Sequence, residues 1–305
     1  MNLHQLELFL AVATQGSVTR AAEVLHISQP AISARLRDLE ASLGEQLFEL
    51  RGRRIYLTDA GVELRAYAET ILRQVEEAQR AVAELRGLDR GMLRVVATTT
   101  VGTYVLPRIL GRFHRAHPGI TLVLDVTNER RALDLVRRRR MDLAVLGLTE
   151  DTADMVVEHF MENHLFITAA PEHPLARREA VAFAELAGYP LLVREEGSGT
   201  RAVMESIFAE RQLTPHIAME MRHSAAIKQA VMAGLGVGLL SDQEMHVELA
   251  SGTLVTLDIE GLTLRRDWHV MHQRDRRLPH AAAAFKQLLL AYAAEQSRHT
   301  SRSDA

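Results

Sequence analysis

One stretch near the N-terminus constrains the fold more than any other part of the chain. Residues 17–43 read SVTRAAEVLHISQPAISARLRDLEASL, two short amphipathic segments separated by a break. Ser17 and Ser28 are favourable N-cap residues, and Pro30 suits the first turn of the second segment, where its missing N–H does no harm. Gly44 is expected to end that segment. The spacing therefore predicts two helices joined by a tight turn.

The second of these helices has two different faces. Its apolar residues recur at steps of four, three and four, and the opposite face is polar. This is the layout of a helix-turn-helix, whose second helix enters the major groove of DNA. The candidate DNA-contacting residues on it are Ser28, Gln29, Pro30, Ser33, Arg35 and Arg37. The alternative is an ordinary helical hairpin with a solvated polar face.

A short hairpin is expected to follow. Residues 45–58, EQLFELRGRRIYLT, contain two extended pieces around an RGRR turn. Residues 1–58 hold six Arg and six Asp or Glu, so attraction to DNA must come from local placement of charge. Arg51, Arg53 and Arg54 on this wing suit the phosphate backbone or an adjacent minor groove. A solvated turn is the alternative.

A long amphipathic helix is expected from Thr58, its N-cap, to about Leu85. Its apolar positions alternate in steps of four and three, a period of 3.5 that is typical of a helix packed along another helix. At 1.5 Å per residue it would be about 40 Å long. The simplest partner is the same helix of a second subunit, and the alternative is the C-terminal domain of the same chain.

After a hinge at residues 86–91, strand-like and helix-like segments alternate, which predicts a parallel sheet with crossover helices. A final amphipathic helix, AAAAFKQLLLAYAAEQ, precedes a tail that is expected to be disordered. The expected domains are a DNA-binding domain (1–58), a linker helix (59–88), an effector-binding domain (89–300) made of lobe I (about 91–162 and 268–297) and lobe II (about 163–267), and the tail (298–305).

Ligands of parallel α/β sheets bind beyond the carboxyl ends of the strands, near helix N-termini. Hydroxyl, amide and glycine residues follow three predicted strands here, and a carboxylate or phosphate suits such groups. The candidate effector-binding residues are Thr98, Thr99, Thr100, Thr127, Asn128, Gly197, Ser198, Gly199, Thr200 and Arg201. For each residue alone, capping of a helix is the alternative role.

Several function classes lose support from what the sequence lacks. There are no cysteines, the 14 His form no metal-ligand motif, and no pair of carboxylates is placed for catalysis. We therefore expect no enzyme activity, no metal and no resident cofactor. The N-terminus is not a signal peptide, and no apolar run reaches the roughly 18 residues of a membrane span. A cytoplasmic protein without a membrane partner is expected.

Taken together, these segments resemble the LysR-type transcriptional regulators. The resemblance is carried by residues 9–61, FLAVATQGSVTRAAEVLHISQPAISARLRDLEASLGEQLFELRGRRIYLTDAG, and extends more weakly along the rest of the chain. It implies an α/β protein with an N-terminal winged helix-turn-helix, a linker helix that forms a dimer, and a two-lobed effector domain like a periplasmic binding protein. In one departure, Leu50 occupies a wing position where the family usually has Arg.

The resemblance also implies partners. These are double-stranded promoter DNA, a second copy of the chain in a homodimer or homotetramer, a small-molecule effector, and RNA polymerase as a further candidate. Residues 98–120, TTTVGTYVLPRILGRFHRAHPGI, are most similar to regulators of Calvin-cycle (Rubisco) operons. The effector would then be a phosphorylated metabolite or NADPH. A regulator of sulfur and cysteine metabolism is the alternative within the family, and a solute-binding protein is the alternative outside it.

Overall fold

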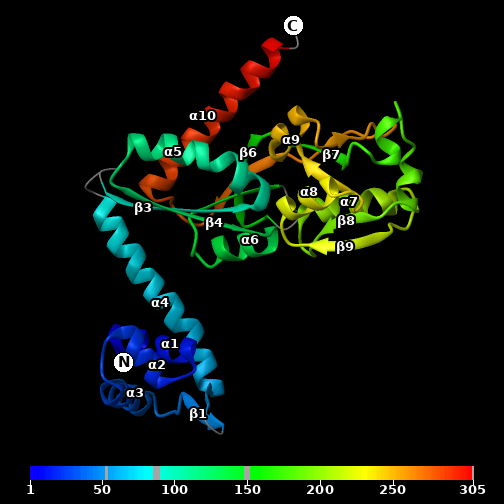
Figure 1. The fold of residues 1–305 in the computed structure, drawn as a ribbon. Helices are drawn as coiled ribbons and strands as arrows, with labels where there is room; N and C mark the ends of the chain where they lie inside the picture. Colours follow the sequence, from blue (N-terminus) through cyan, green and yellow to red (C-terminus); the bar gives the residue numbers. More distant parts are fainter. Residues whose placement is uncertain (52–53, 85–89, 148–151, 304–305) are drawn as a thin grey trace. The chain divides into compact units, whose positions relative to one another are not determined.

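The computed structural model describes residues 1–51, 54–84, 90–147 and 152–303. The chain divides into two compact units, Met1–Leu85 and Arg86–Ala305 (Figure 1). Each unit has its own hydrophobic core, so each is described by itself. In the described parts of the chain, no helix is long and apolar enough to cross a membrane.

The N-terminal unit is a small helical domain with a hairpin and one long helix. Its elements are α1 (Leu3–Gln15), α2 (Val18–Leu25), α3 (Gln29–Leu43), β1 (Phe48–Arg51), β2 (Arg54–Leu57) and α4 (Asp59–Glu84). Phe9 and Val12 of α1 meet Ile32 of α3 in one core. Phe9 also packs against Phe48 of the hairpin, with ring centroids 5.3 Å apart. The hairpin thereby attaches to the three-helix bundle.

Most of the predicted helix boundaries are confirmed. The Ser17 side chain accepts a hydrogen bond from the backbone N–H of Arg20, and the Thr58 hydroxyl accepts one from Gly61 N–H at 3.1 Å. Gly44 ends α3 in the left-handed conformation. Ser28 occupies the N-cap position of α3 as predicted, but its side chain is exposed and makes no capping hydrogen bond.

The apolar seam of α4 has two different environments. Its first half belongs to the N-terminal core, where Ala68 is fully buried and Leu64 and Ile71 pack around it. Farther along the helix Val82 is 66% exposed. The seam therefore covers the N-terminal domain first, a partner that the sequence analysis did not weigh, and leaves an apolar surface beyond it.

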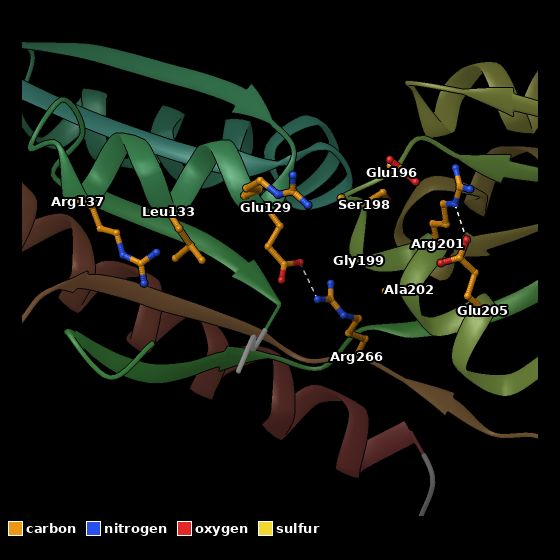
Figure 2. A pocket seen from close by; sticks show the side chains of 12 residues that line it. Glu129, Leu133, Arg137, Glu196, Ser198, Gly199, Arg201, Ala202, Glu205 and Arg266 are labelled. Carbon is orange, nitrogen blue, oxygen red and sulfur yellow. Dashed lines mark hydrogen bonds and ion pairs between the residues drawn. The ribbon is translucent and has the colours of Figure 1, made fainter. Parts of the chain in front are cut away.

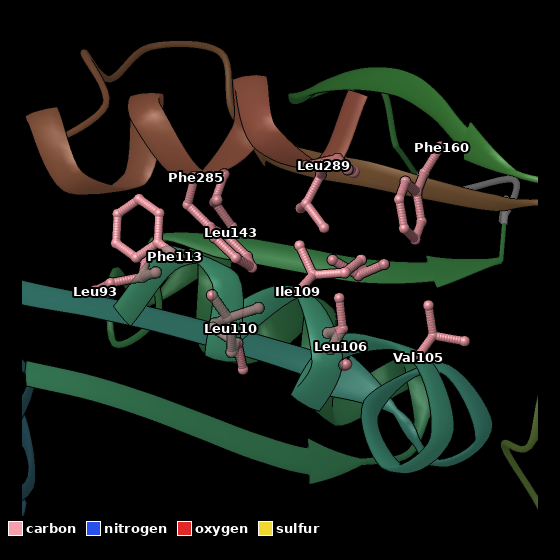
Figure 3. Close-up of a cluster of buried hydrophobic side chains, with 14 of the residues drawn as sticks. Leu93, Val105, Leu106, Ile109, Leu110, Phe113, Leu143, Phe160, Phe285 and Leu289 are labelled. Atoms are coloured by element: carbon pink, nitrogen blue, oxygen red, sulfur yellow. The ribbon is translucent and has the colours of Figure 1, made fainter. Parts of the chain in front are cut away.

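Lobe I of the second unit is a sheet with helices on both faces. Its elements are β3 (Gly91–Thr98), a π-helical turn (Val101–Val105), α5 (Leu106–Ala116), β4 (Ile120–Thr127), α6 (Glu129–Arg137), β5 (Leu143–Gly147), β6 (Met155–Met161), β13 (Trp268–Gln273) and α10 (His280–Ser303), with strand order β4-β3-β5-β13-β6. Alternate residues of β3 face opposite sides. Val95 packs under α5 and α10 in the cluster that contains Phe113 and Phe285 (Figure 3). Val96 packs under α6 with Leu133.

Lobe II repeats this plan. Its strands are β7 (His164–Ala169), β8 (Leu191–Arg194), β9 (Ile217–Met221), β10 (Val237–Ser241), β11 (Val255–Thr256) and β12 (Leu264–Arg265), and its helices are α7 (Gly199–Glu210), α8 (Ser224–Met232) and α9 (His246–Ser251). The strand order is β11-β7-β10-β8-β9, with β12 beside β7. Phe208 of α7 packs on one face of this sheet, and Ile227 of α8 packs on the other.

The prediction of a parallel sheet was incomplete, because each lobe contains a reversed strand. In lobe I, β3 runs parallel to β4 and β5, but β13 runs antiparallel to β5 and β6. In lobe II, β7 runs antiparallel to β10. β13 and β7 are the strands by which the chain enters a lobe from the other lobe. The chain leaves one lobe at the carboxyl ends of its strands, so it enters the other at the same edge and runs the opposite way.

The end of the chain also differs from the prediction. A disordered tail was expected from residue 298, whereas α10 continues to Ser303. Residues 297–303 contain no Gly or Pro, so nothing in this stretch stops a helix.

Gly61 provides a test of the packing between α4 and the hairpin. A Cβ at this position would lie 2.2 Å from the backbone oxygen of Leu47, whereas a Cβ at Gly111 in α5 would meet nothing closer than 3.7 Å. We expect Gly61→Ala to lower the free energy of unfolding by about 1–3 kcal/mol through overpacking. Gly111→Ala should raise it by up to about 1 kcal/mol, because Ala favours helix. Urea unfolding followed by circular dichroism measures both, and equal effects would contradict the close packing.

Candidate DNA-binding surface and effector cleft

The polar face of α3 is accessible in the structure. Gln29, Arg35 and Arg37 are exposed and Ser33 is half-buried, while Ile32, on the opposite face, is fully buried. Because the buried stripe fixes the rotation of the helix, the predicted DNA-contacting residues are presented to solvent together. Their contact with DNA stays a prediction.

The wing is an antiparallel hairpin in which Arg51 is paired with Arg54 in the strand register. Arg53 lies outside the described residues. Leu50, at the position where the family usually has Arg, is 76% exposed. An exposed leucine cannot supply a charge to the phosphate backbone, so at this position the wing lacks that contact.

The predicted effector residues gather at the carboxyl ends of the parallel strands. We call the small space between the lobes at this edge the inner cavity; its volume is about 30 Å³. Eight of the ten predicted residues line it, namely Thr98, Thr99, Thr100, Thr127, Asn128, Ser198, Gly199 and Thr200. The other two, Gly197 and Arg201, line a neighbouring outer cavity of about 350 Å³.

Arg201 does not face the inner cavity because carboxylates of its own lobe hold it. Its Nε donates to Glu205 at 2.7 Å, and its Nη1 donates to Glu220 at 2.5 Å. Arg201 lines the outer cavity instead, and its contribution to effector binding stays a prediction.

Sequence reasoning missed two arginines that line the inner cavity. Arg194 is the last residue of β8, so the strand-end rule that selected Thr98 also applied to it. Arg266 lies between β12 and β13, where the chain passes from lobe II to lobe I. No local pattern marks a crossover of this kind. The further residues found at the cavity are Glu129, Asn163, Leu165 and Trp268.

Arg194 is a buried cation that joins the two lobes. Its guanidinium donates to both carboxylate oxygens of Glu195, at 2.9 and 3.2 Å, and to the hydroxyl of Thr99 in lobe I at 3.2 Å. Only 5% of Arg194 is exposed. Its charge, which Glu195 balances, lies in a poorly hydrated setting, where charges interact more strongly than in water.

Arg266 forms an ion pair with Glu129, the first residue of α6. The Arg266 Nη2 donates to the Glu129 carboxylate at 2.7 Å. Burial raises the pKa of Glu129, although the neighbouring Arg266 opposes the rise. Both residues line each of the two cavities. Figure 2 shows their ion pair at the outer cavity.

The site as a whole is suited to an anion. The N-terminal ends of α6 and α7, where partial positive charge accumulates, reach the inner cavity through Asn128 and Ser198. Ser198 is buried and its side chain makes no capping bond to α7. Two arginines also line this cavity, each paired with a carboxylate, Arg194 with Glu195 and Arg266 with Glu129. In the described residues no group of three or more His, Asp or Glu is placed to hold a metal ion.

Fold and site together define a regulator with a winged helix-turn-helix and a two-lobed ligand-binding domain, and comparisons with known proteins give its family. Residues 3–62 match the model of the bacterial regulatory helix-turn-helix proteins of the lysR family, and residues 86–294 match the LysR substrate binding domain. The chain therefore belongs to the LysR-type transcriptional regulators, which confirms the predicted family and fold class.

Among relatives, the RuBisCO operon transcriptional regulator of Allochromatium vinosum is 42% identical over 294 residues, which cover 96% of this chain and 97% of that protein. Among solved structures, the regulatory domain of Synechocystis PCC6803 CcmR in complex with 2-PG is 30% identical, with a TM-score of 0.64 over 67% of this chain and 98% of that one. Full-length CbnR complexed with its target DNA has a TM-score of 0.72 at 23% identity, covering 95% and 99% of the two chains. These relatives are regulators, in agreement with the expectation that the chain is not an enzyme.

The buried arginine of the inner cavity gives a prediction about stability. Arg194→Ala leaves the Glu195 carboxylate, which is 16% exposed, without its guanidinium partner. We expect a loss of about 2–3 kcal/mol in the free energy of unfolding, because an unpaired and largely buried charge is costly. Arg178→Ala, which breaks the exposed pair with Glu185, should cost about 1 kcal/mol or less. Urea unfolding of both variants makes the comparison, and equal losses would contradict it.

Proposed function

We propose that this protein controls transcription of CO2-fixation genes in response to a small phosphorylated carboxylate. The observation that carries the proposal is the inner cavity, where two arginines, the N-terminal ends of α6 and α7, and several hydroxyls converge. A relative with 42% identity is named a RuBisCO operon regulator, which supports this class of target genes. CcmR, whose regulatory domain was solved with 2-PG, suggests 2-phosphoglycolate as the first ligand to test.

The proposed division of labour follows the predicted domains. Residues 1–58 bind promoter DNA, residues 59–88 pair with a second subunit, and residues 89–300 bind the effector. The distal part of the α4 seam, with half-buried Val75 and exposed Val82, is the surface for the second subunit. Sedimentation equilibrium at micromolar concentration should give a dimer or a tetramer, and a monomer would contradict this part of the proposal.

We propose that the effector changes the cleft when it binds. The inner cavity is small, at about 30 Å³, and adjoins the outer cavity. We propose that binding is accompanied by movement of side chains or of the two lobes. A ligand that prefers one arrangement of the lobes shifts the protein toward it. We propose that this shift changes the spacing of DNA-binding domains within the oligomer and hence the bend of the promoter.

Thermal unfolding of the full-length protein tests the proposed effector. A ligand at 100 times its dissociation constant adds about 2.7 kcal/mol of stability, so 2-phosphoglycolate should raise the melting temperature measurably. Glycolate, which lacks the phosphate, should not. Thr100→Val and Ser198→Ala should each reduce the shift, because both hydroxyl residues line the inner cavity.

Other outcomes of this experiment are also informative. A shift only with sulfur-assimilation intermediates would favour the regulator of sulfur metabolism. No shift with any phosphorylated metabolite or NADPH would remove the proposed effector class. DNase footprints that are the same with and without the bound effector would contradict the change in spacing.

Two variants test how the protein reads DNA. Gln29→Ala should relax sequence preference, because a side chain at the start of the recognition helix contacts base edges. Arg53→Ala should weaken binding to all sequences by a similar factor and reduce the salt dependence, as expected for a phosphate contact. Gel shifts with a promoter and a scrambled duplex separate the two effects. If Gln29→Ala kept both the affinity for the promoter and the sequence preference, α3 would not be the recognition helix.

A further inference from the structure

The Arg266–Glu129 ion pair separates two cavities of very different character. The inner cavity is small and lined by hydroxyls and arginines, and the outer cavity is about 350 Å³ and open beside α6 and α7 (Figure 2). The two cavities share four lining residues, namely Glu129, Ser198, Gly199 and Arg266. An anion that binds Arg266 from either cavity therefore lies beside the carboxylate of Glu129.

Arg266 is held in place independently of Glu129. Its backbone N–H donates to the carbonyl of Asn163 at 2.8 Å, which ties together the two crossovers between the lobes. Its guanidinium passes between two glycines. A Cβ on Gly147 of lobe I would lie 2.4 Å from it, and a Cβ on Gly199 of lobe II would lie 2.1 Å from it. The absence of side chains at these two positions leaves room for the arginine at the N-terminus of α7.

Glu129 is the one acidic residue among the described residues that line the inner cavity. Its carboxylate is 13% exposed and occupies the Nη2 donor of Arg266. The raised pKa of Glu129 indicates that the ion pair does not fully compensate its burial. Displacing the Glu129 carboxylate from Arg266 therefore costs less free energy than displacing a carboxylate whose ion pair fully offsets its desolvation.

We propose that Glu129 is a built-in competitor of the effector, which holds Arg266 in the ligand-free protein and is displaced when an anion binds. The inference rests on the proposed function, because it assumes that the inner cavity receives the anion. The displaced carboxylate can move into the outer cavity, which adjoins it. Arg130, the next residue of α6, also lines that cavity and offers a positive charge. Competition raises the concentration of effector that is needed and favours ligands with two negative charges over those with one.

Calorimetric titration of the full-length protein tests the proposal, with 2-phosphoglycolate and inorganic phosphate as separate probes. Glu129→Gln keeps the size of the side chain and removes its charge. Both probes should bind about tenfold more tightly than to the wild type, because a charge-assisted hydrogen bond no longer has to be broken. Glu129→Asp keeps the charge and shortens the side chain, and should give an intermediate affinity.

Glu205→Gln is the matched control. It makes the same change in net charge at the wall of the outer cavity, but the Glu205 carboxylate pairs with Arg201 and not with Arg266 (Figure 2). Its affinity for both probes should stay within about twofold of the wild type. If Glu205→Gln increased affinity as much as Glu129→Gln, the cause would be a general effect of charge. That result would contradict the proposal that Glu129 competes with the effector.

The outcomes distinguish this inference from the proposed function. If the wild type binds 2-phosphoglycolate and neither Glu129 variant gains affinity, the effector stands and the competitor is overturned. If 2-phosphoglycolate does not bind but phosphate binds more tightly to Glu129→Gln than to the wild type, the competitor stands and the proposed effector fails. If no protein binds either probe, both are overturned. Thermal unfolding of each variant shows that it is folded before titration.

Discussion

The arrangement of the effector domain depends on where the chain crosses between its lobes. Both crossovers lie at the carboxyl edge of the parallel strands, at Asn163 and Arg266, and a backbone hydrogen bond joins them. This constraint reverses β7 and β13, which begin at the cleft. It also places strand ends and helix N-termini from both lobes around one space. The polar lining of the cleft is thus a consequence of topology.

Charge in this cleft is balanced within the protein. Arg194 is neutralised by Glu195, its neighbour in sequence, and Arg266 by Glu129 from the other side of the cleft. The two pairs differ in kind. The first pair is made within one strand end and remains whatever the lobes do. The second joins a crossover to a helix of lobe I, so it is sensitive to any movement that changes the cleft.

Much of this architecture was predictable from the sequence because the signals were local. Ser17, Thr58 and Gly44 mark helix ends by their own chemistry, and the threonines at residues 98–100 follow a strand whatever the rest of the chain does. The same rule applied to Arg194 and was not used there. Arg266 and Glu129 were missed for a physical reason. Their meeting depends on a crossover and on two glycines far apart in sequence, and periodicity does not report contacts of that kind.

The way α4 is built into the N-terminal domain has a mechanical consequence. The first half of the helix shares a core with α1 and α3, and Gly61 brings its start against the backbone of Leu47. The helix and the domain therefore turn as one body. A rotation of the distal part of α4, which is about 39 Å long, would therefore also turn α3. In a dimer, the crossing angle of two such helices would then set the relative positions of the two copies of α3 on the DNA.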